Sequence, residues 1–386
     1  MLKYVYGIGI ACLTGAILIL SISVLSNKQN QLPSSSLLAE IDTPEGFQRA
    51  ENPLDWEFPM DLGPHPEYQT EWWYYTGNLE SENGDRFGYQ LTIFRRAVRP
   101  EMERIERDSA WAADQIYMGH FAISDASAGK HYAFERFSRG AAGLAGAQSD
   151  PYQVWLENWQ VSQLSEDQYR LTAEQDGIRL DLILDDLKGP TLHGEEGYSQ
   201  KGPEKGNASH YYSQTRLETS GSIQTDSGSY QVSGLSWKDH EFSTRALSSN
   251  QVGWDWFSIQ LDDGSDLMVF QIRREDGSVD PFSSGSFINP EGDLINLAKE
   301  DFEIQVQDSW RSSESGAEYP SQWRIAVPAI DLRLQIQPIL SDQEMKVSYT
   351  YWEGAVDVQG ILDGNDVSGS GYVEMTGYAG SFEGEF

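Results

Sequence analysis

A single cysteine among 386 residues excludes several kinds of chemistry. Cys12 lies in an apolar N-terminal run, so the rest of the chain has no disulfide, no thiolate nucleophile and no cysteine-ligated zinc. The six histidines never occur as HxH or HExxH, which excludes the helical zinc-protease motif. Positive charge is scarce too: 27 Lys and Arg against 60 Asp and Glu give a net charge of −33. Such a surface repels phosphate, so we expect no nucleic-acid partner.

Common catalytic and cofactor motifs are also missing. No Gly-x-Ser-x-Gly elbow, glycine-rich phosphate loop or dinucleotide fingerprint occurs, so the residues support neither a serine hydrolase nor a nucleotide-dependent enzyme. The acidic segment 262–266 has Arg273 at the twelfth position, where a calcium-binding EF-hand loop needs glutamate. We interpret that segment as a turn, and we expect no metal and no cofactor.

The N-terminus predicts export. Residues 5–25 carry no charged side chain. A cleaved signal peptide usually has an apolar core of about 7–15 residues, whereas a membrane-spanning helix needs about 17–25. We therefore favour a retained signal anchor in residues 1–28, followed by a linker at 29–44; cleavage after Ser26 is the alternative. The acidic body is then anchored to the cytoplasmic membrane, facing the periplasm or the exterior, or it is secreted if the segment is cleaved.

After the linker the chain is rich in aromatic residues and in strand-like sequence. Its 12 Trp, 19 Tyr and 15 Phe indicate a packed core. Segments 72–79 and 86–95 flank an Asn-Gly pair, and the second alternates apolar and polar positions, which predicts a β-hairpin. Many similar short segments follow, and only residues 101–115 suggest a helix. This pattern is typical of all-β barrels or sandwiches.

An internal similarity predicts two β-domains in tandem. Segment 254–261 can be laid over 72–79, with aromatic residues at matching positions. Each is followed by an acidic, glycine-containing turn and an apolar strand that ends in two arginines. We place the domains at about residues 45–245 and 246–386.

Several long motifs resemble one family. The run HPEYQTEWWYYTGNL at 65–79 and the run FGYQLTIFR at 87–95 resemble the opening of the AttH-like, carotenoid 1,2-hydratase-related lipocalin-like family. Residues 119–125, 237–242 and 253–258 resemble its later motifs, and the similarity extends from about residue 53 to near the C-terminus. The resemblance implies two lipocalin-like antiparallel β-barrels that meet at an interface, here following an N-terminal apolar helix.

The resemblance leaves the activity open. The chain is most similar to the exported branch of the family, whose members are often called predicted secreted hydrolases. Relatives include carotenoid hydratases, cyclases of polyene-like natural products, and proteins linked to ABC export systems. An ABC transporter is therefore an implied partner, and hydratase, lyase or isomerase chemistry an implied alternative.

The candidate acids and bases lie in two short segments. Adding water to an isolated double bond requires a strong proton donor in an apolar pocket. Asp239, His240, Glu241 and Asp255 are the candidate catalytic residues. In a strand, Asp239 and Glu241 point one way and His240 the other, so the three cannot share one pocket. We expect His240 and Asp255 on the wall of one apolar cavity near Trp254 or Trp256; alternatively both are buried structural groups at the domain junction.

Aromatic residues supply candidate walls for a ligand. The ligand-binding candidates are Trp72, Trp73, Tyr75, His120, Trp237, Trp254 and Trp256. Because neighbours in a strand face opposite sides, some of these rings must instead fill a barrel core. His65, Glu67 and Glu71 lie nearby in sequence and can contribute to the mouth of a site.

Three functions are compatible with the sequence. The first, which we favour, is an exported, membrane-anchored protein that binds a hydrophobic small molecule and passes it to a transporter. The second is a cofactor-independent lyase, hydratase or isomerase acting on an unsaturated isoprenoid- or polyene-like substrate by acid catalysis. The third is a non-catalytic structural envelope protein whose aromatic residues are all core.

Overall fold

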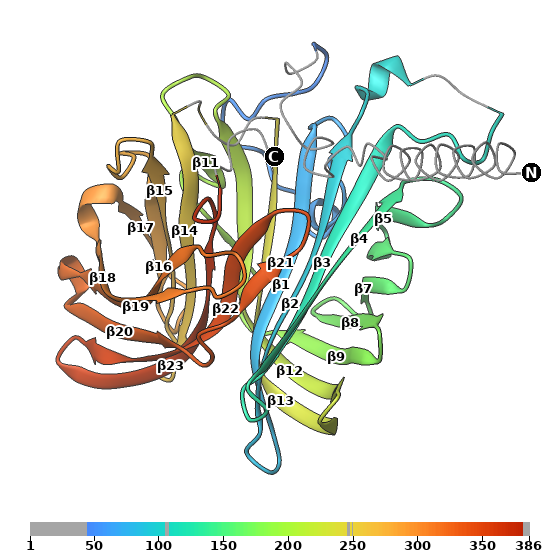
Figure 1. Cartoon of the computed structure of the whole chain (residues 1–386). Coiled ribbons are helices and arrows are strands. Elements are labelled where there is room, and N and C mark those ends of the chain that lie inside the picture. The colour runs from blue at the N-terminus through green and yellow to red at the C-terminus, as the bar shows by residue number, and fades with distance from the viewer. Residues whose placement is uncertain (1–44, 105–107, 245–247, 249, 381–386) are drawn as a thin grey trace, which may run out of the picture. The chain divides into compact units, whose positions relative to one another are not determined.

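The computed structural model describes residues 45–104, 108–244, 248 and 250–380. The proposed anchor, the linker and Cys12 lie outside these residues, so the structure does not test them. No helix in the described ranges is long and apolar enough to span a bilayer. The compact unit Ala39–Phe386 contains every described residue, and it is built from two antiparallel sheets that curl into two nearly closed barrels (Figure 1). The predicted all-β, two-barrel architecture is confirmed.

The first barrel takes its 13 strands from the N-terminal part of the chain. They are β1 (Thr70–Ser81), β2 (Arg86–Ala97), β3 (Gln115–Asp125), β4 (Lys130–Arg139), β5 (Ala145–Ser149), β6 (Tyr152–Leu156), β7 (Trp159–Gln163), β8 (Gln168–Gln175), β9 (Ile178–Asp186), β10 (Pro190–Leu192), β11 (Tyr198–Gln200), β12 (Ala208–Thr225) and β13 (Gly228–Ser243). The order is β4-β3-β2-β1-β13-β12-β9-β8-β7-β6-β5, with β10 and β11 paired to β12.

The second barrel has ten strands. They are β14 (Gln251–Leu261), β15 (Asp266–Arg274), β16 (Ser284–Ile288), β17 (Leu294–Ala298), β18 (Glu303–Arg311), β19 (Glu318–Val327), β20 (Leu332–Pro338), β21 (Glu344–Lys346), β22 (Thr350–Leu362) and β23 (Asn365–Met375). The order is β17-β16-β15-β14-β23-β22-β20-β19-β18, with β21 paired to β22. Four 3-10 turns complete the described elements: η2 (Met60–Leu62), η3 (Glu101–Glu103), η4 (Lys299–Asp301) and η5 (Pro328–Ile330).

The predicted helix at 101–115 is wrong. Among the residues described in this range only η3 forms, residues 108–114 contain no helix, and β3 begins at Gln115. The backbone N–H of Val98 donates to the carbonyl of Asp114 at 2.8 Å, which closes the loop between β2 and β3. That bond extends the β2–β3 pairing into the segment, in place of the internal bonds that a helix requires.

The strands bury alternate side chains on two sides. On β1, Trp73 and Tyr75 pack inside the first barrel, while Trp72 and Tyr74 face the second. This two-residue period follows from strand geometry. Each barrel thus has its own apolar core, and a third apolar cluster lies where the barrels meet. Its buried members are Tyr74, Tyr211, Trp237, Trp256, Met268, Phe270, Ile272, Ala355 and Tyr372.

Close backbone approach holds the barrels together. A Cβ on Gly88 of β2 would lie 2.5 Å from the Cβ of Ala355 on β22, so only glycine permits this contact. The Asn78 amide donates to the carbonyl of Gly371 at 2.9 Å. Asp266 of the second barrel pairs with Lys188 and Arg216 of the first, at 2.8 and 2.7 Å. These contacts fix the walls of the space between the barrels.

A candidate binding and acid site between the barrels

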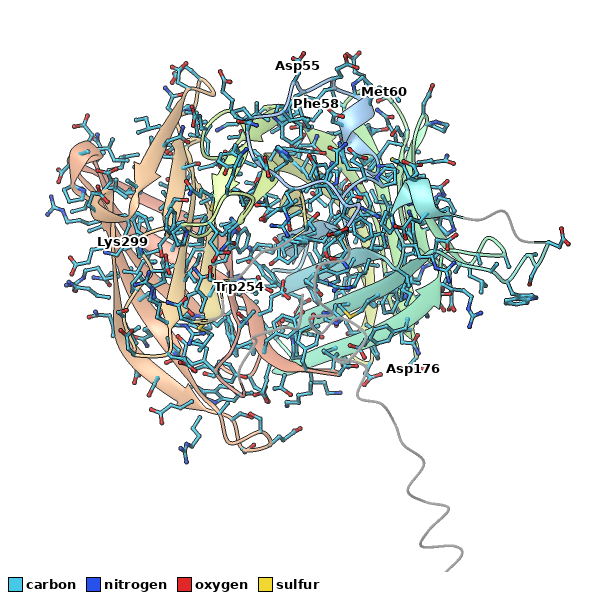
Figure 2. The ribbon with its side chains drawn as sticks, turned by 90° about the horizontal axis from the view of Figure 1, so that it is seen from above. Asp55, Phe58, Met60, Asp176, Trp254 and Lys299 are labelled. Atoms are coloured by element: carbon cyan, nitrogen blue, oxygen red, sulfur yellow. The ribbon has the colours of Figure 1, made fainter. Side chains whose placement is uncertain are left out.

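A pocket opens between the two barrels. It contains about 800 Å³ of empty space, including open solvent at its mouth. The view from above places Trp254 between the barrels, with Asp176 and Lys299 on their outer sides (Figure 2). Apolar and aromatic walls face a few polar groups, as in many small-molecule sites. The lining residues are Trp72, Tyr74, Phe94, Lys201, Tyr211, Asp239, Glu241, Trp254, Trp256, Phe270, Ile272 and Glu374.

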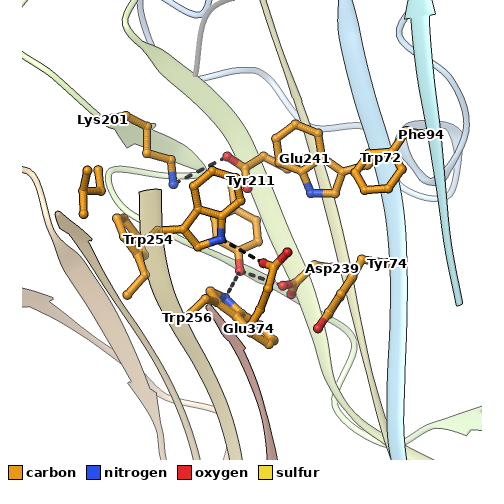
Figure 3. A pocket seen from close by; sticks show the side chains of 12 residues that line it. Trp72, Tyr74, Phe94, Lys201, Tyr211, Asp239, Glu241, Trp254, Trp256 and Glu374 are labelled. Carbon is orange, nitrogen blue, oxygen red and sulfur yellow. Dashed lines mark hydrogen bonds and ion pairs between the residues drawn. The ribbon is translucent and has the colours of Figure 1, made fainter. Parts of the chain in front are cut away.

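Asp239 is the most completely hydrogen-bonded carboxyl in the pocket (Figure 3). Tyr211 Oη donates to its Oδ2 at 2.8 Å, and Trp237 Nε1 donates to its Oδ1 at 2.6 Å. Ser213 also donates to Oδ1, and Trp256 Nε1 donates to the Tyr211 hydroxyl at 3.1 Å. Burial raises the pKa of Asp239 to about 7 despite these donors, and the nearby Glu241 adds to the rise. This carboxyl can therefore hold a proton at neutral pH.

A histidine extends the Asp239 network away from the pocket. His193 Nε2 lies 2.6 Å from the Ser213 hydroxyl, and its Nδ1 lies 2.9 Å from the hydroxyl of Ser286 in the second barrel. Burial lowers the pKa of His193 to about 3, with a further contribution from Lys201. The ring is thus neutral, and it orients Ser213 toward the carboxyl.

Glu374 is a second carboxyl on the pocket wall. Trp254 Nε1 donates to its Oε2 at 2.8 Å. Burial raises the pKa of Glu374 to about 7, and the charges of Asp239 and Glu241 raise it further. Asp239 and Glu374 therefore both have a pKa raised to about 7, which suits a proton donor near neutral pH.

Lys201 is the one cation among the lining residues. Its Nζ lies 3.5 Å from Glu241 Oε1 and 4.1 Å from the centre of the Phe270 ring. Burial lowers the pKa of Lys201, and Glu241 opposes that change. The Glu241 carboxylate is thus the ion-pair partner of Lys201 at the pocket wall.

His240 faces the interior of the first barrel, opposite to Asp239. Its Nε2 lies 2.9 Å from Glu71 Oε1, and its Nδ1 lies 3.0 Å from the Tyr212 hydroxyl. Burial lowers the pKa of His240 to about 4. Glu71 also contacts His65 Nδ1 at 3.0 Å and Arg95 Nε at 2.8 Å, and all four groups are buried.

This cluster has the residue types of a metal site. The ligand atoms of His65, Glu71 and His240 lie within 4.8 Å of one another. The guanidinium of Arg95, however, already balances the Glu71 carboxylate, and a divalent ion would add uncompensated charge in the core. We therefore interpret the cluster as a structural ion-pair network.

The expected cavity shared by His240 and Asp255 is wrong. Neither residue lines the pocket. Asp255 is buried in the second barrel, where Arg273 Nε donates to it at 3.1 Å and Gln271 Nε2 at 2.8 Å. Both residues alternate with pocket residues along their strands, so strand geometry turns them away from it.

The other candidates divide by strand face. Those that line the pocket are Asp239, Glu241, Trp72, Trp254 and Trp256. Trp73 and Tyr75 belong to the core of the first barrel, and Trp237 lies behind the pocket, where it donates to Asp239. His120 contacts Tyr351 of the second barrel instead. Sequence reasoning missed Tyr74, Phe94, Lys201, Tyr211, Phe270, Ile272 and Glu374 as lining residues.

The model of the AttH-like family matches residues 49–378. The chain belongs to the AttH-like family. No curated protein matches it. Among solved structures, a candidate AttH from Nitrosomonas europaea is 34% identical, with a TM-score of 0.77 over 86% of this chain and 100% of that one. The AttH-like fold also resembles kievitone hydratase of Nectria haematococca, at 14% identity and a TM-score of 0.63 over 87% and 98% of the chains. CghA with Sch210972 is 11% identical, with a TM-score of 0.50 over 85% and 97%.

Proposed function

We propose that this AttH-like protein binds a hydrophobic small molecule in the pocket between its barrels. The observation that carries the proposal is that seven aromatic side chains line one open space, with carboxyl groups at defined positions among them. The aromatic lining residues are Trp72, Tyr74, Phe94, Tyr211, Trp254, Trp256 and Phe270. Each barrel has a buried core of its own, separate from this pocket.

A polyene probe tests the binding proposal. Retinol should quench tryptophan fluorescence of the full chain in a saturable way, because Trp254 and Trp256 line the pocket. Trp254→Ala should weaken binding roughly tenfold or more, the loss expected for a buried aromatic contact. Trp111→Ala is the matched control, since Trp111 is 60% exposed on the β2–β3 loop. Equal affinities for both variants would contradict the proposal.

A second candidate function is acid catalysis on an unsaturated, isoprenoid- or polyene-like substrate. It is favoured by one observation: Asp239, which borders the pocket, is buried and has a pKa of about 7. Its proton would add to one alkene carbon and leave a cation on the other, which the electron-rich faces of Trp254 and Trp256 would stabilise. Water addition gives a hydratase product, and loss of a different proton gives an isomer. The Asp239 carboxylate then recovers a proton.

Isotope incorporation tests this chemistry. Geraniol incubated with the protein in D2O should gain carbon-bound deuterium, as detected by mass spectrometry. Asp239→Asn should abolish the gain, whereas Asp226→Asn, at an exposed turn, should not. Incorporation that survives Asp239→Asn would exclude Asp239 as the donor.

We also propose that residues 1–28 anchor the protein in the cytoplasmic membrane, with the folded body facing the periplasm or the exterior. The support is the uncharged segment 5–25, which is long enough for a spanning helix. Association with an ABC transporter rests on the resemblance of the motifs to export-linked relatives. The protein should remain with membranes after a high-salt wash; a soluble form that begins near Asn27 would show cleavage instead.

A further inference from the structure

Two glutamates lie directly opposite each other at the back of the pocket. Glu353 on β22 pairs in register with Glu374 on β23, so the two side chains share one face of the sheet, and Glu353 interacts with Tyr74 of the first barrel. Glu353 is 1% exposed, and neither of its oxygens has a standard hydrogen-bond partner among the described residues. The buried hydroxyls of Tyr74 and Tyr372 interact with Glu353, but neither makes a close hydrogen bond within the described part of the chain. A carboxyl so buried and so poorly bonded needs an explanation.

Burial and proximity both favour a proton on this pair. Burial raises the pKa of Glu353 well above its usual range, and the charge of Glu374 raises it further. The hydroxyls of Tyr74 and Tyr351 oppose the change without overcoming it. Two adjacent carboxyls in a low-dielectric site cannot both ionise at neutral pH, so they titrate as a unit.

A chain of polar groups leads from Glu353 to the surface. The Tyr351 hydroxyl, which interacts with Glu353, lies 2.8 Å from His120 Nδ1. His120 Nε2 lies 3.2 Å from Glu135 Oε1, and the side chain of Glu135 is 15% exposed. His120 and Tyr351 are themselves buried. Neither the binding proposal nor the acid proposal above gives a role to Tyr351, His120 or Glu135.

We propose that Glu353 and Glu374 hold a shared proton behind the pocket and that Tyr351, His120 and Glu135 conduct protons between this pair and solvent. The proposal rests on the proposed acid function, for which it supplies the source of protons. Once Asp239 has given its proton to the ligand, the neighbouring Glu374 restores that proton, and Glu353 passes its own to Glu374. The Tyr351 hydroxyl then donates to Glu353 and takes a proton from His120, and Glu135 returns one from water to His120.

Infrared spectroscopy tests the pair without any ligand. The full chain at neutral pH should show the carbonyl stretch of protonated carboxyls, and Glu353→Gln should remove part of it. If that variant fails to fold, Glu374→Gln at the pocket wall should have the same effect. Glu344→Gln is the matched control, because Glu344 is equally buried but accepts hydrogen bonds from Ser312, Ser315 and Tyr319. A band that neither Glu353→Gln nor Glu374→Gln changes would overturn the shared proton.

Exchange kinetics test the path. After transfer into D2O, the Glu353-dependent band should shift, and Tyr351→Phe should slow the shift about tenfold or more by removing one proton carrier. Tyr349→Phe is the control, since its ring lies 5.4 Å from that of Tyr351 and 5.3 Å from His120. Equal rates in both variants would overturn the path. Retinol binding plays no part in either readout, so failure of the binding proposal is recognised separately.

Discussion

Asp239 and His240 are neighbours in sequence but face opposite sides of strand β13. Asp239 borders the pocket between the barrels, whereas His240 lies in the first barrel and contacts Glu71 at 2.9 Å. The strand thus separates a polar group available to a ligand from one committed to the fold. The same separation holds on β14, where Trp254 and Trp256 line the pocket and Asp255 pairs with Arg273.

Asp239→Asn should make the protein relatively more stable at high pH. The folded-state pKa of about 7 exceeds the ordinary value of 3.8, so the folded state binds more protons between these limits. The free energy of unfolding of the wild type therefore falls as pH rises from about 4 to 7. Asparagine does not titrate, so the variant escapes this loss. Its free energy of unfolding relative to that of the wild type should therefore rise by on the order of 3 kcal/mol between pH 4 and pH 8. Urea unfolding at both pH values measures it; a pH-independent difference contradicts the raised pKa.

His240→Ala should destabilise the fold and spare the pocket. The change leaves a cavity and deprives Glu71 of one buried partner, at a cost of about 2–4 kcal/mol. Retinol affinity should stay within about twofold of wild type, because His240 does not line the pocket. Thermal unfolding and fluorescence titration give the two values. A variant that keeps native stability but loses retinol binding would contradict this account and show that His240 belongs to the binding site.

Lys238→Met should stabilise the protein near neutral pH. Lys238 is fully buried among the rings of Tyr75, Tyr152, Tyr169 and Tyr212. Burial lowers its pKa from 10.5 to about 7, so the unfolded state binds more protons between these values. The free energy of unfolding of the wild type therefore rises as pH increases from about 7 to 10.5. Below pH 7 the full cost of burying the charged Lys238 amine is present.

Methionine lacks this penalty. The gain from Lys238→Met should be about 1–4 kcal/mol at pH 7 and should shrink toward pH 10. Denaturant unfolding at pH 7, 8.5 and 10 follows the trend. A loss of stability at every pH would instead show that the interactions between Lys238 and the tyrosine rings hold the barrel together.

Trp254→Phe should change the pH profile more than the affinity. The substitution keeps an aromatic ring but removes the N–H that donates to Glu374 at 2.8 Å. This bond favours the charged carboxylate, so its loss raises the pKa of Glu374 further. Deuterium incorporation should persist to higher pH, while retinol binding weakens by about 0.5–1.5 kcal/mol. A downward shift of the profile would contradict the role of this bond.

The sequence predicted the fold well where the signals were local. The hairpin expected at 72–79 and 86–95 forms as β1 and β2, with Trp72 opposite Phe94 and Leu79 opposite Phe87. Periodicity two also predicted that Asp239 and His240 face opposite ways. It did not reveal that β13 extends to Ser243, because the polar run Lys238–Asp239–His240–Glu241 does not resemble a buried strand.

The site depended on pairings that local patterns do not contain. Glu374 reaches the pocket because β23 pairs with β14, which sets it opposite Trp256. Lys201 follows the short strand β11, and the loop beyond it ends at β12. Neither residue lies in a recognisable motif, so only the folded chain brings them beside Asp239.

Photoaffinity labelling of the pocket tests the central claim most directly. An isoprenoid alcohol that carries a diazirine, irradiated with the full chain, should label peptides from β14 and β15, at Trp254, Phe270 and Ile272. Excess retinol should suppress these labels. Labels confined to the first barrel's interior, around Tyr152 and Trp159, or to the exposed Trp111, would contradict a ligand site between the barrels.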